Sequence, residues 1–381
     1  MMKNAFVLAG VLTCILCAAG CSHDPDETGR LLVSPQDTIS LRSSAIPSTT
    51  DTTYLVQIGG GSALVGYSQG IESRALVEFS GFTGIPSIAP VDSAVIQIPL
   101  NYWFRDSGGT LAFSAYEMLT SWTAASFTFT RSDSTGIRNT TPCASFLANL
   151  QPSDTMISFH IDSLVRSWIR SGTDAPNGVM LIPSTISTNV ITGTRPSVYT
   201  DTRPILKVFY RDTTADTTVT WSALADQEGF VANTAPVVQQ GTIVLQAGIT
   251  YRGLIRFDSL AIPPNVSITR ATLRLVRDDA GSVTNPQTRD TVLAYLLLKN
   301  QLPYDSLALG TICSPSDSLG YHMYTGDVRT IIQQWIVRKP NYGIVLRPYG
   351  EATTFDCFAI YGSSAPAALR PRLTITYTVL P

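Results

Sequence analysis

Short segments in which apolar and polar residues alternate run through most of the chain. Residues 94–98, 271–275 and 373–377 each place an apolar side chain at every second position. A period of two residues is that of a β-strand with one face in a core and the other in water. Burial on one face is typical of antiparallel sheets, so the pattern predicts an all-β chain of antiparallel sandwiches.

Two segments have helical spacing instead. One begins at Asp162 and the other at Asp327, and each Asp suits the N-cap of a short helix. The apolar stripes that follow are interpreted as core, with each Trp as a packing anchor. The stripes are Leu164, Val165, Trp168 and Ile169 in one helix, and Ile331, Ile332, Trp335 and Ile336 in the other.

The chain repeats itself. Six blocks recur in the same order, beginning with residues 70–79, which match residues 248–257 at an offset of 178. Ordered self-similarity indicates two copies of one domain. We expect domains at residues 40–210 and 221–381, joined by a Thr/Asp-rich linker at residues 211–220. The other matched blocks are 86 with 264, 94–98 with 271–275, 168–169 with 335–336, 178–183 with 343–348, and 203–210 with 370–377.

The repeated pattern resembles the DNRLRE domain, which is grouped with carbohydrate-binding module family 96. The resemblance covers residues 45–379, and the first copy departs from it with Ile182 in place of Arg347 and Ile205 in place of Arg372. It implies two tandem jelly-roll β-sandwiches, each with one short helix, on a secreted or surface bacterial protein. Some members of the family bind acidic or neutral polysaccharides. The matching segments of the second copy are 252–257, 271–275, 327–336, 341–348 and 370–377.

The first residues have the features of a lipoprotein signal peptide. Residues 1–20 combine Lys3 with an apolar stretch too short to span a bilayer comfortably, and they end in Ala18-Ala19-Gly20 before Cys21. Small residues before a Cys resemble a lipobox, which implies that Cys21 is lipidated. The alternative is an ordinary signal peptide with Cys21 as a thiol.

The expected location is the bacterial outer membrane or cell surface. Ser22, rather than Asp, follows Cys21, which resembles an outer-membrane address. Residues 23–27 are short, acidic and contain Pro25, and with the polar residues that follow they predict a flexible tether at residues 21–39 that lifts the first domain off the membrane.

Composition argues against nucleic-acid binding and leaves little material for a metal site. Lys and Arg number 26 against 28 Asp and Glu, so no excess of positive charge is available to bind nucleic acid. The three His fall in the tether and in different domains, which leaves no pair for a metal site. Cys313 and Cys357 both lie in the second expected domain. They either form a disulfide or remain two free thiols.

Two motifs match patterns associated with catalysis or metal binding. Residues 66–70 fit the G-x-S-x-G elbow of hydrolases, but the repeat predicts a strand after Ser68 where the mechanism needs a helix. A turn is therefore expected there, and the chain is predicted not to be an enzyme. Asp278 and Asp279 in a Gly-containing turn are either Ca²⁺ ligands or caps of their own turn.

One strand suggests a ligand platform. If the alternation of residues 94–98 continues, Gln97, Asn101, Trp103 and Arg105 share the outer face. A flat indole flanked by amide and guanidinium donors suits a sugar ring. The alternative is that Pro99 breaks the alternation and Trp103 turns inward.

These observations favour a non-catalytic cell-surface lipoprotein that binds polysaccharide through β-sandwich modules, with the first domain as the binder. The alternative is a structural or adhesive surface protein whose domains act as spacers or protein contacts.

Overall fold

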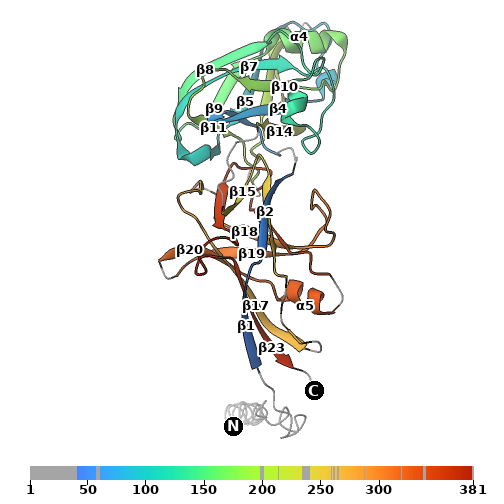
Figure 1. Ribbon diagram of the computed structural model, residues 1–381. Helices are drawn as coiled ribbons and strands as arrows, with labels where there is room; N and C mark the ends of the chain where they lie inside the picture. Colours follow the sequence, from blue (N-terminus) through green and yellow to red (C-terminus); the bar gives the residue numbers. More distant parts are fainter. Residues whose placement is uncertain are drawn as a thin grey trace, which may run out of the picture.

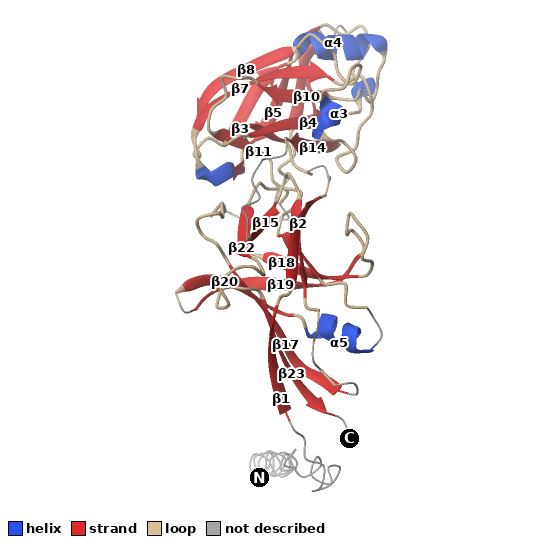
Figure 2. Ribbon diagram, viewed as in Figure 1, coloured by secondary structure: helices blue, strands red, loops and turns tan. Residues whose placement is uncertain are grey.

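A computed structural model describes residues 41–379 except 57–60, 198–200, 213, 234–240, 259, 261, 264, 265, 287, 319, 338 and 339. The expected signal peptide, Cys21 and the tether of residues 21–39 lie outside the described residues. Within the described part, no helix is long and apolar enough to cross a membrane. Two β domains lie end to end, and the expectation of an all-β fold is confirmed (Figures 1 and 2).

The first domain is the upper one in Figure 1 and contains two sheets. The larger sheet has the order β6-β11-β3-β4-β10-β7-β8, with β14 also paired to β4. The smaller sheet has the order β13-β12-β5-β9. Its elements are β3 (Leu64–Ser68), β4 (Ile71–Glu78), η1 (Phe82–Gly84), β5 (Val91–Pro99), β6 (Tyr102–Trp103), η2 (Phe104–Asp106), β7 (Gly109–Glu117), α3 (Phe129–Ser132), β8 (Ala144–Leu150), β9 (Met156–His160), α4 (Asp162–Ser171), β10 (Val179–Pro183), β11 (Val190–Gly193), β12 (Ile205–Asp212), β13 (Thr217–Leu224) and β14 (Gln227–Ala232).

The second domain repeats this plan in one curled sheet of 11 strands. Its long β19 pairs with both β18 and β20 and so joins the two halves that are separate sheets in the first domain. Its elements are β1 (Leu41–Pro47), β2 (Thr50–Leu55), β15 (Thr242–Gln246), β16 (Tyr251–Arg256), β17 (Val266–Val276), β18 (Val292–Leu297), β19 (Leu307–Ser318), β20 (Tyr321–Asp327), α5 (Arg329–Val337), β21 (Ile344–Pro348), β22 (Cys357–Tyr361) and β23 (Arg372–Val379).

The first two strands of the chain belong to the second domain. β1 pairs with β23 and β2 pairs with β16, so the blue strands lie along the lower domain in Figure 1. In the first domain, β13 and β14 occupy the corresponding places beside β12 and β4. The expected boundaries are therefore wrong. The expected linker of residues 211–220 lies in the β12–β13 hairpin of the first domain. The strands at residues 41–55, expected in the first domain, belong to the second domain.

Each domain has a core of the expected side chains. Trp168 and Trp335 are 4% and 8% exposed, which confirms that both pack in the core. Asp327 caps α5 by accepting from the Arg329 N–H at 2.9 Å. Asp162 does not cap α4 with its side chain, because its carboxylate accepts from the Ala94 N–H of β5 at 2.7 Å. The first domain also has a second short helix, α3, which the sequence pattern did not predict.

A partly buried carboxyl on β14 predicts a dependence of stability on pH. Glu228 accepts from the Thr194 hydroxyl at 2.8 Å, and burial raises the pKa of Glu228 from 4.5 to about 7. Between pH 4.5 and 7, Glu228 is therefore protonated in the folded chain and ionised in the unfolded chain. The stabilisation is present below pH 4.5 and is lost as pH rises through 7, by about 3 kcal/mol at most. Denaturant unfolding at pH 5 and pH 8 should show this loss in the wild type and not in Glu228→Gln.

The control for this prediction is Asp226→Asn. Asp226 is exposed and lies two residues away on the same segment. That variant should keep the wild-type dependence on pH. An unchanged pH dependence in Glu228→Gln would show that another group titrates.

Candidate functional site

The structure contradicts the expected platform at Trp103. β5 ends at Pro99, and the chain then crosses to the other sheet, where Trp103 on β6 pairs with Thr192 of β11. Trp103 is 1% exposed and packs in the core of the first domain. The prediction failed because it carried the alternation of β5 through residues 99–101, where the strand ends.

The other predicted platform residues do not converge on a ligand site. Gln97 is half-buried on β5 in the smaller sheet, between β12 and β9. The Asn101 amide is occupied by the backbone of Arg195: it donates to the carbonyl at 2.9 Å and accepts from the N–H at 2.6 Å. Arg105 is exposed in η2, which lies outside the smaller sheet.

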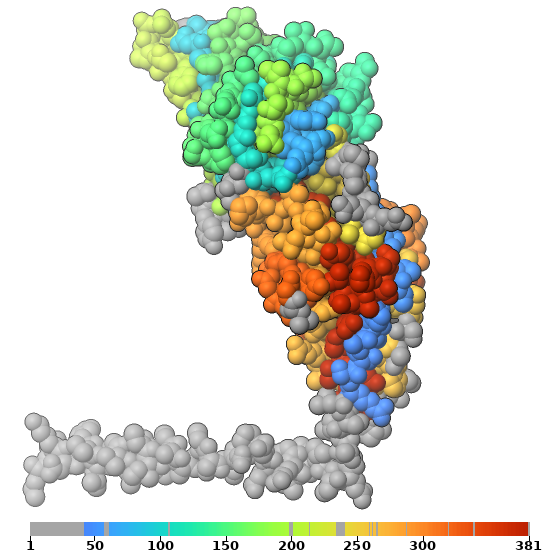
Figure 3. Space-filling view, turned by 60° about the vertical axis from the view of Figure 1, so that its left-hand side comes forward, coloured from blue at the N-terminus to red at the C-terminus, as the bar shows by residue number. Residues whose placement is uncertain are grey.

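The aromatic cluster Tyr102-Trp103-Phe104 forms the joint between the domains. The Phe355 N–H of the second domain donates to the Tyr102 hydroxyl at 2.8 Å. The Phe355 ring lies 5.9 Å from Phe104 and 5.0 Å from Phe230, measured between ring centroids. The Asn285 amide donates to the Trp103 carbonyl. These contacts hold the domains end to end in the elongated body that Figure 3 shows.

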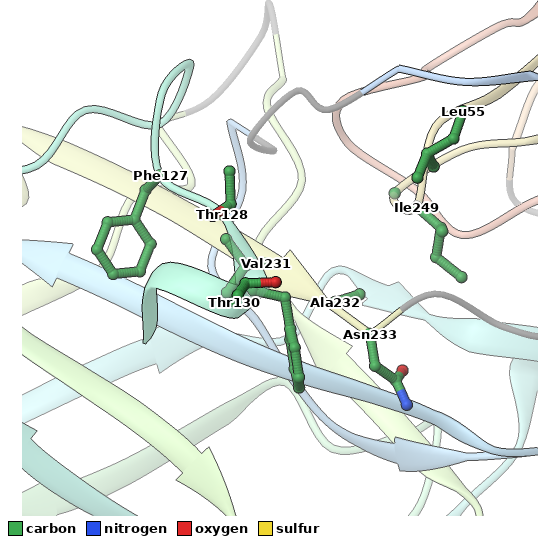
Figure 4. A pocket seen from close by; sticks show the side chains of 10 residues that line it. Leu55, Phe127, Thr128, Thr130, Val231, Ala232, Asn233 and Ile249 are labelled. Carbon is green, nitrogen blue, oxygen red and sulfur yellow. The ribbon is translucent and has the colours of Figure 1, made fainter. Parts of the chain in front are cut away.

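A pocket of about 270 Å³ lies beside this joint (Figure 4). Its walls come from residues 127–130 of the first domain, residues 231–233 at the end of β14, Leu55 of β2 and residues 248–249 of the second domain. Asn233, whose side chain lies in its wall, accepts from the Glu72 N–H and donates to the Gly70 carbonyl. None of the described residues that line it is charged. We interpret the pocket as a gap between packed domains.

A groove on the first domain offers better binding chemistry. It has a volume of about 310 Å³, and we call it the Tyr67 groove. Tyr67 of β3 is 41% exposed and lies directly opposite Glu72 of β4, so the two side chains share one face of the hairpin. The lining residues are Tyr67, Glu72, Pro183, Ser184, Thr185 and Ser187.

The Glu72 carboxylate of the Tyr67 groove is held in place by Arg74. Glu72 accepts from Arg74 at 2.7 Å, and Arg74 also donates to Asp133 at 2.5 Å and to Ser132 at 2.7 Å. The Arg74 guanidinium lies over the Phe129 ring, 4.2 Å from its centroid. A fixed carboxylate beside an exposed phenol ring can accept hydrogen bonds from sugar hydroxyls while the ring stacks on axial C–H groups.

The sequence signal nearest this groove is the G-x-S-x-G motif at residues 66–70, in which Tyr67 precedes Ser68. Ser68 of the G-x-S-x-G motif is buried at the end of β3, and a turn at Gln69-Gly70 leads directly into β4. The helix that a nucleophile elbow needs does not follow Ser68, as expected. Tyr67, its neighbour, is the exposed side chain. At the offset of 178 residues Tyr67 aligns with Leu245, which is fully buried, so the second domain does not share the groove.

The acidic turn behaves as a self-capped turn. Asp278 accepts from the Ala280 N–H at 3.2 Å, and Asp279 accepts from Arg277 at 2.5 Å. Among the residues that the structure describes, no group of three or more His, Cys, Asp or Glu side chains is placed to hold a metal ion.

The cysteines of the described region are free thiols. Cys313 and Cys357 do not pair, which answers the alternative left open by the sequence. Burial raises the pKa of Cys143 to about 11 and that of Cys313 and Cys357 to about 12. All three are therefore thiols, the unreactive form, at neutral pH.

Comparison with protein-family models gives no match for this chain, and comparison with curated proteins gives none either.

Proposed function

We propose that this chain is a non-catalytic, lipid-anchored surface protein whose first domain binds polysaccharide in the Tyr67 groove. The observation that carries the proposal is the exposed Tyr67 ring directly opposite a fixed carboxylate, Glu72, in a groove whose other wall includes Thr185. The resemblance of the repeats to the DNRLRE domain supports the same class of ligand. One aromatic contact adds about 1 kcal/mol, so a single chain binds weakly. Many copies on one cell surface bind one long polymer together, which raises the overall avidity.

The proposed lipid anchor changes which domain lies near the membrane. β1 begins at Leu41, beside the C-terminal strand β23, at the end of the second domain that is far from the first domain (Figure 1). An anchor at Cys21 then places the second domain next to the membrane. The second domain acts as the spacer that holds the Tyr67 groove outward.

A purely structural role is the second candidate. The aromatic joint and the strands exchanged between the domains make one elongated body, which suits a spacer or a protein contact module. Binding to polysaccharide separates the two candidates, because a spacer has no affinity for the polymer.

Affinity electrophoresis tests the proposal. In gels cast with acidic or neutral polysaccharides, the wild-type chain should be retarded by at least one polymer. Tyr67→Ala should run as it does in a gel without polymer, because it removes the ring on which the sugar stacks. Its melting temperature should stay within about 2 °C of the wild type, since an exposed residue contributes little to stability.

The matched control is Tyr321→Ala on the second domain, where Tyr321 is 43% exposed. This variant should be retarded like the wild type. Unchanged migration of the wild-type chain in every polymer would favour the spacer. Equal retardation of Tyr67→Ala and wild type would place the binding site elsewhere.

A further inference from the structure

The two domains exchange equivalent pairs of strands. We call residues 41–55 (β1 and β2) the N-terminal arm and residues 217–232 (β13 and β14) the middle arm. Pro47 of β1 pairs with Arg372, and Leu224 of β13 pairs with Ile205. The repeat aligns Ile205 with Arg372, so Pro47 and Leu224 occupy equivalent positions. Thr50 faces Arg256 and Gln227 faces Glu78 in the same way. Both comparisons give an offset of 177 residues, so the arms are equivalent parts, each placed on the domain of the other repeat.

The N-terminal arm is held mainly by its backbone. Its seven-residue β1 and six-residue β2 form continuous ladders with β23 and β16. Of the side chains of residues 42–55, only Ser48 and Tyr54 are buried. A few side chains add to these ladders. Asp51 accepts from the Ser363 N–H at 2.5 Å, and Thr53 accepts from the Val244 N–H at 3.0 Å. The Tyr54 ring packs on Tyr304, with ring centroids 5.1 Å apart. Strand addition of this kind takes its affinity from main-chain hydrogen bonds.

The middle arm is held much more firmly. Phe230 and Val231 are 1% and 5% exposed and pack into two apolar clusters. The half-buried Trp221 packs on Phe82, with ring centroids 5.1 Å apart. A short hairpin connects this arm directly to β12. The N-terminal arm therefore buries fewer side chains than the middle arm, and we expect it to separate first when the structure opens.

We propose that the N-terminal arm is exchangeable, and that the edges of β16 and β23, once their own arm has left, accept the same arm from a second copy of this chain. The second copy fits because it presents the same ladder, the same Tyr54 and the same Asp51. Monomer and exchanged dimer make the same contacts, which makes such an exchange a low-cost route to a dimer. This inference does not depend on the proposed polysaccharide binding.

Cysteine cross-linking between two copies tests the exchange. Ser43 of β1 lies opposite Thr376 of β23, at a spacing that suits a disulfide. One full mature chain carries Ser43→Cys and a first affinity tag, and the other carries Thr376→Cys and a second tag. The two are mixed in mild denaturant, returned to buffer and oxidised. We expect a disulfide-linked heterodimer whose yield rises with protein concentration.

Two controls define the outcomes. The double variant Ser43→Cys, Thr376→Cys should form the bond within one chain, and Ser43→Cys mixed with Gln301→Cys, at an exposed loop position, should give no heterodimer. The proposal is overturned if the double variant does not close, if the Gln301→Cys pair cross-links equally well, or if no heterodimer forms at any concentration.

A rate measurement distinguishes exchange from an ordinary surface dimer. Asp51→Ala removes a charged hydrogen-bond acceptor from the arm in both forms, so the arm is released at least about tenfold faster. The equilibrium fraction of dimer should not change, because monomer and dimer lose the same contact. A changed dimer fraction with an unchanged exchange rate would contradict the proposal.

Discussion

Replacing Trp103 with alanine is expected to lower the free energy of unfolding by about 3–5 kcal/mol, the loss typical of emptying a buried aromatic site. Trp103 is 1% exposed and is among the largest fully buried side chains of the described chain. Its backbone carbonyl accepts from Asn285, so the cavity would form directly behind the joint. Urea or guanidinium denaturation of wild type and variant measures the difference.

Trp103→Phe is the matched control for this variant. The Trp103 indole nitrogen is buried and has no hydrogen-bond partner in the described structure, so the ring acts through packing alone. Phenylalanine should therefore recover most of the lost stability. A loss below about 1 kcal/mol in Trp103→Ala would mean that Trp103 is exposed, and would restore it as a candidate sugar contact.

Replacing Glu351 with alanine is expected to destabilise the chain by a similar amount, about 3–5 kcal/mol. Glu351 is 5% exposed and accepts from the buried Arg252 through two bonds, of 2.7 and 3.0 Å. Arg347 donates to the same carboxylate. Removal of Glu351 would leave a buried guanidinium without its counter-charge. Denaturant unfolding measures the loss.

The double variant Arg252→Met, Glu351→Leu separates charge from packing. It removes both members of the ion pair and leaves apolar side chains of similar size, so it should lose less stability than Glu351→Ala alone. A double variant less stable than the single one would show that the pair itself, and not the unpaired charge, sets the stability.

Local periodicity identified many of the strands and both main helices from the sequence. The alternating segments 94–98, 271–275 and 373–377 lie in β5, β17 and β23, and the two Trp stripes form α4 and α5. These elements are predictable because a half-buried strand or helix imposes its own period on neighbouring residues.

The pairing of the N-terminal arm and the surroundings of Trp103 and Tyr67 could not be predicted, because they depend on contacts between residues far apart in the sequence. The N-terminal arm pairs with residues about 200 and 330 positions further along the chain, through backbone groups that every residue carries. Trp103 was misplaced because a strand was extended past Pro99. Tyr67 was missed because its exposure depends on loop 183–187, which forms the other wall of its groove.

Differential scanning calorimetry tests most directly the central claim that the exchanged arms and the aromatic joint make the two domains one folding unit. The wild-type chain should unfold in a single cooperative transition whose van't Hoff and calorimetric enthalpies agree. Phe355→Ala, which empties the joint between Phe104 and Phe230, should split that transition into two. Two separate transitions in the wild type, unchanged in Phe355→Ala, would contradict the account.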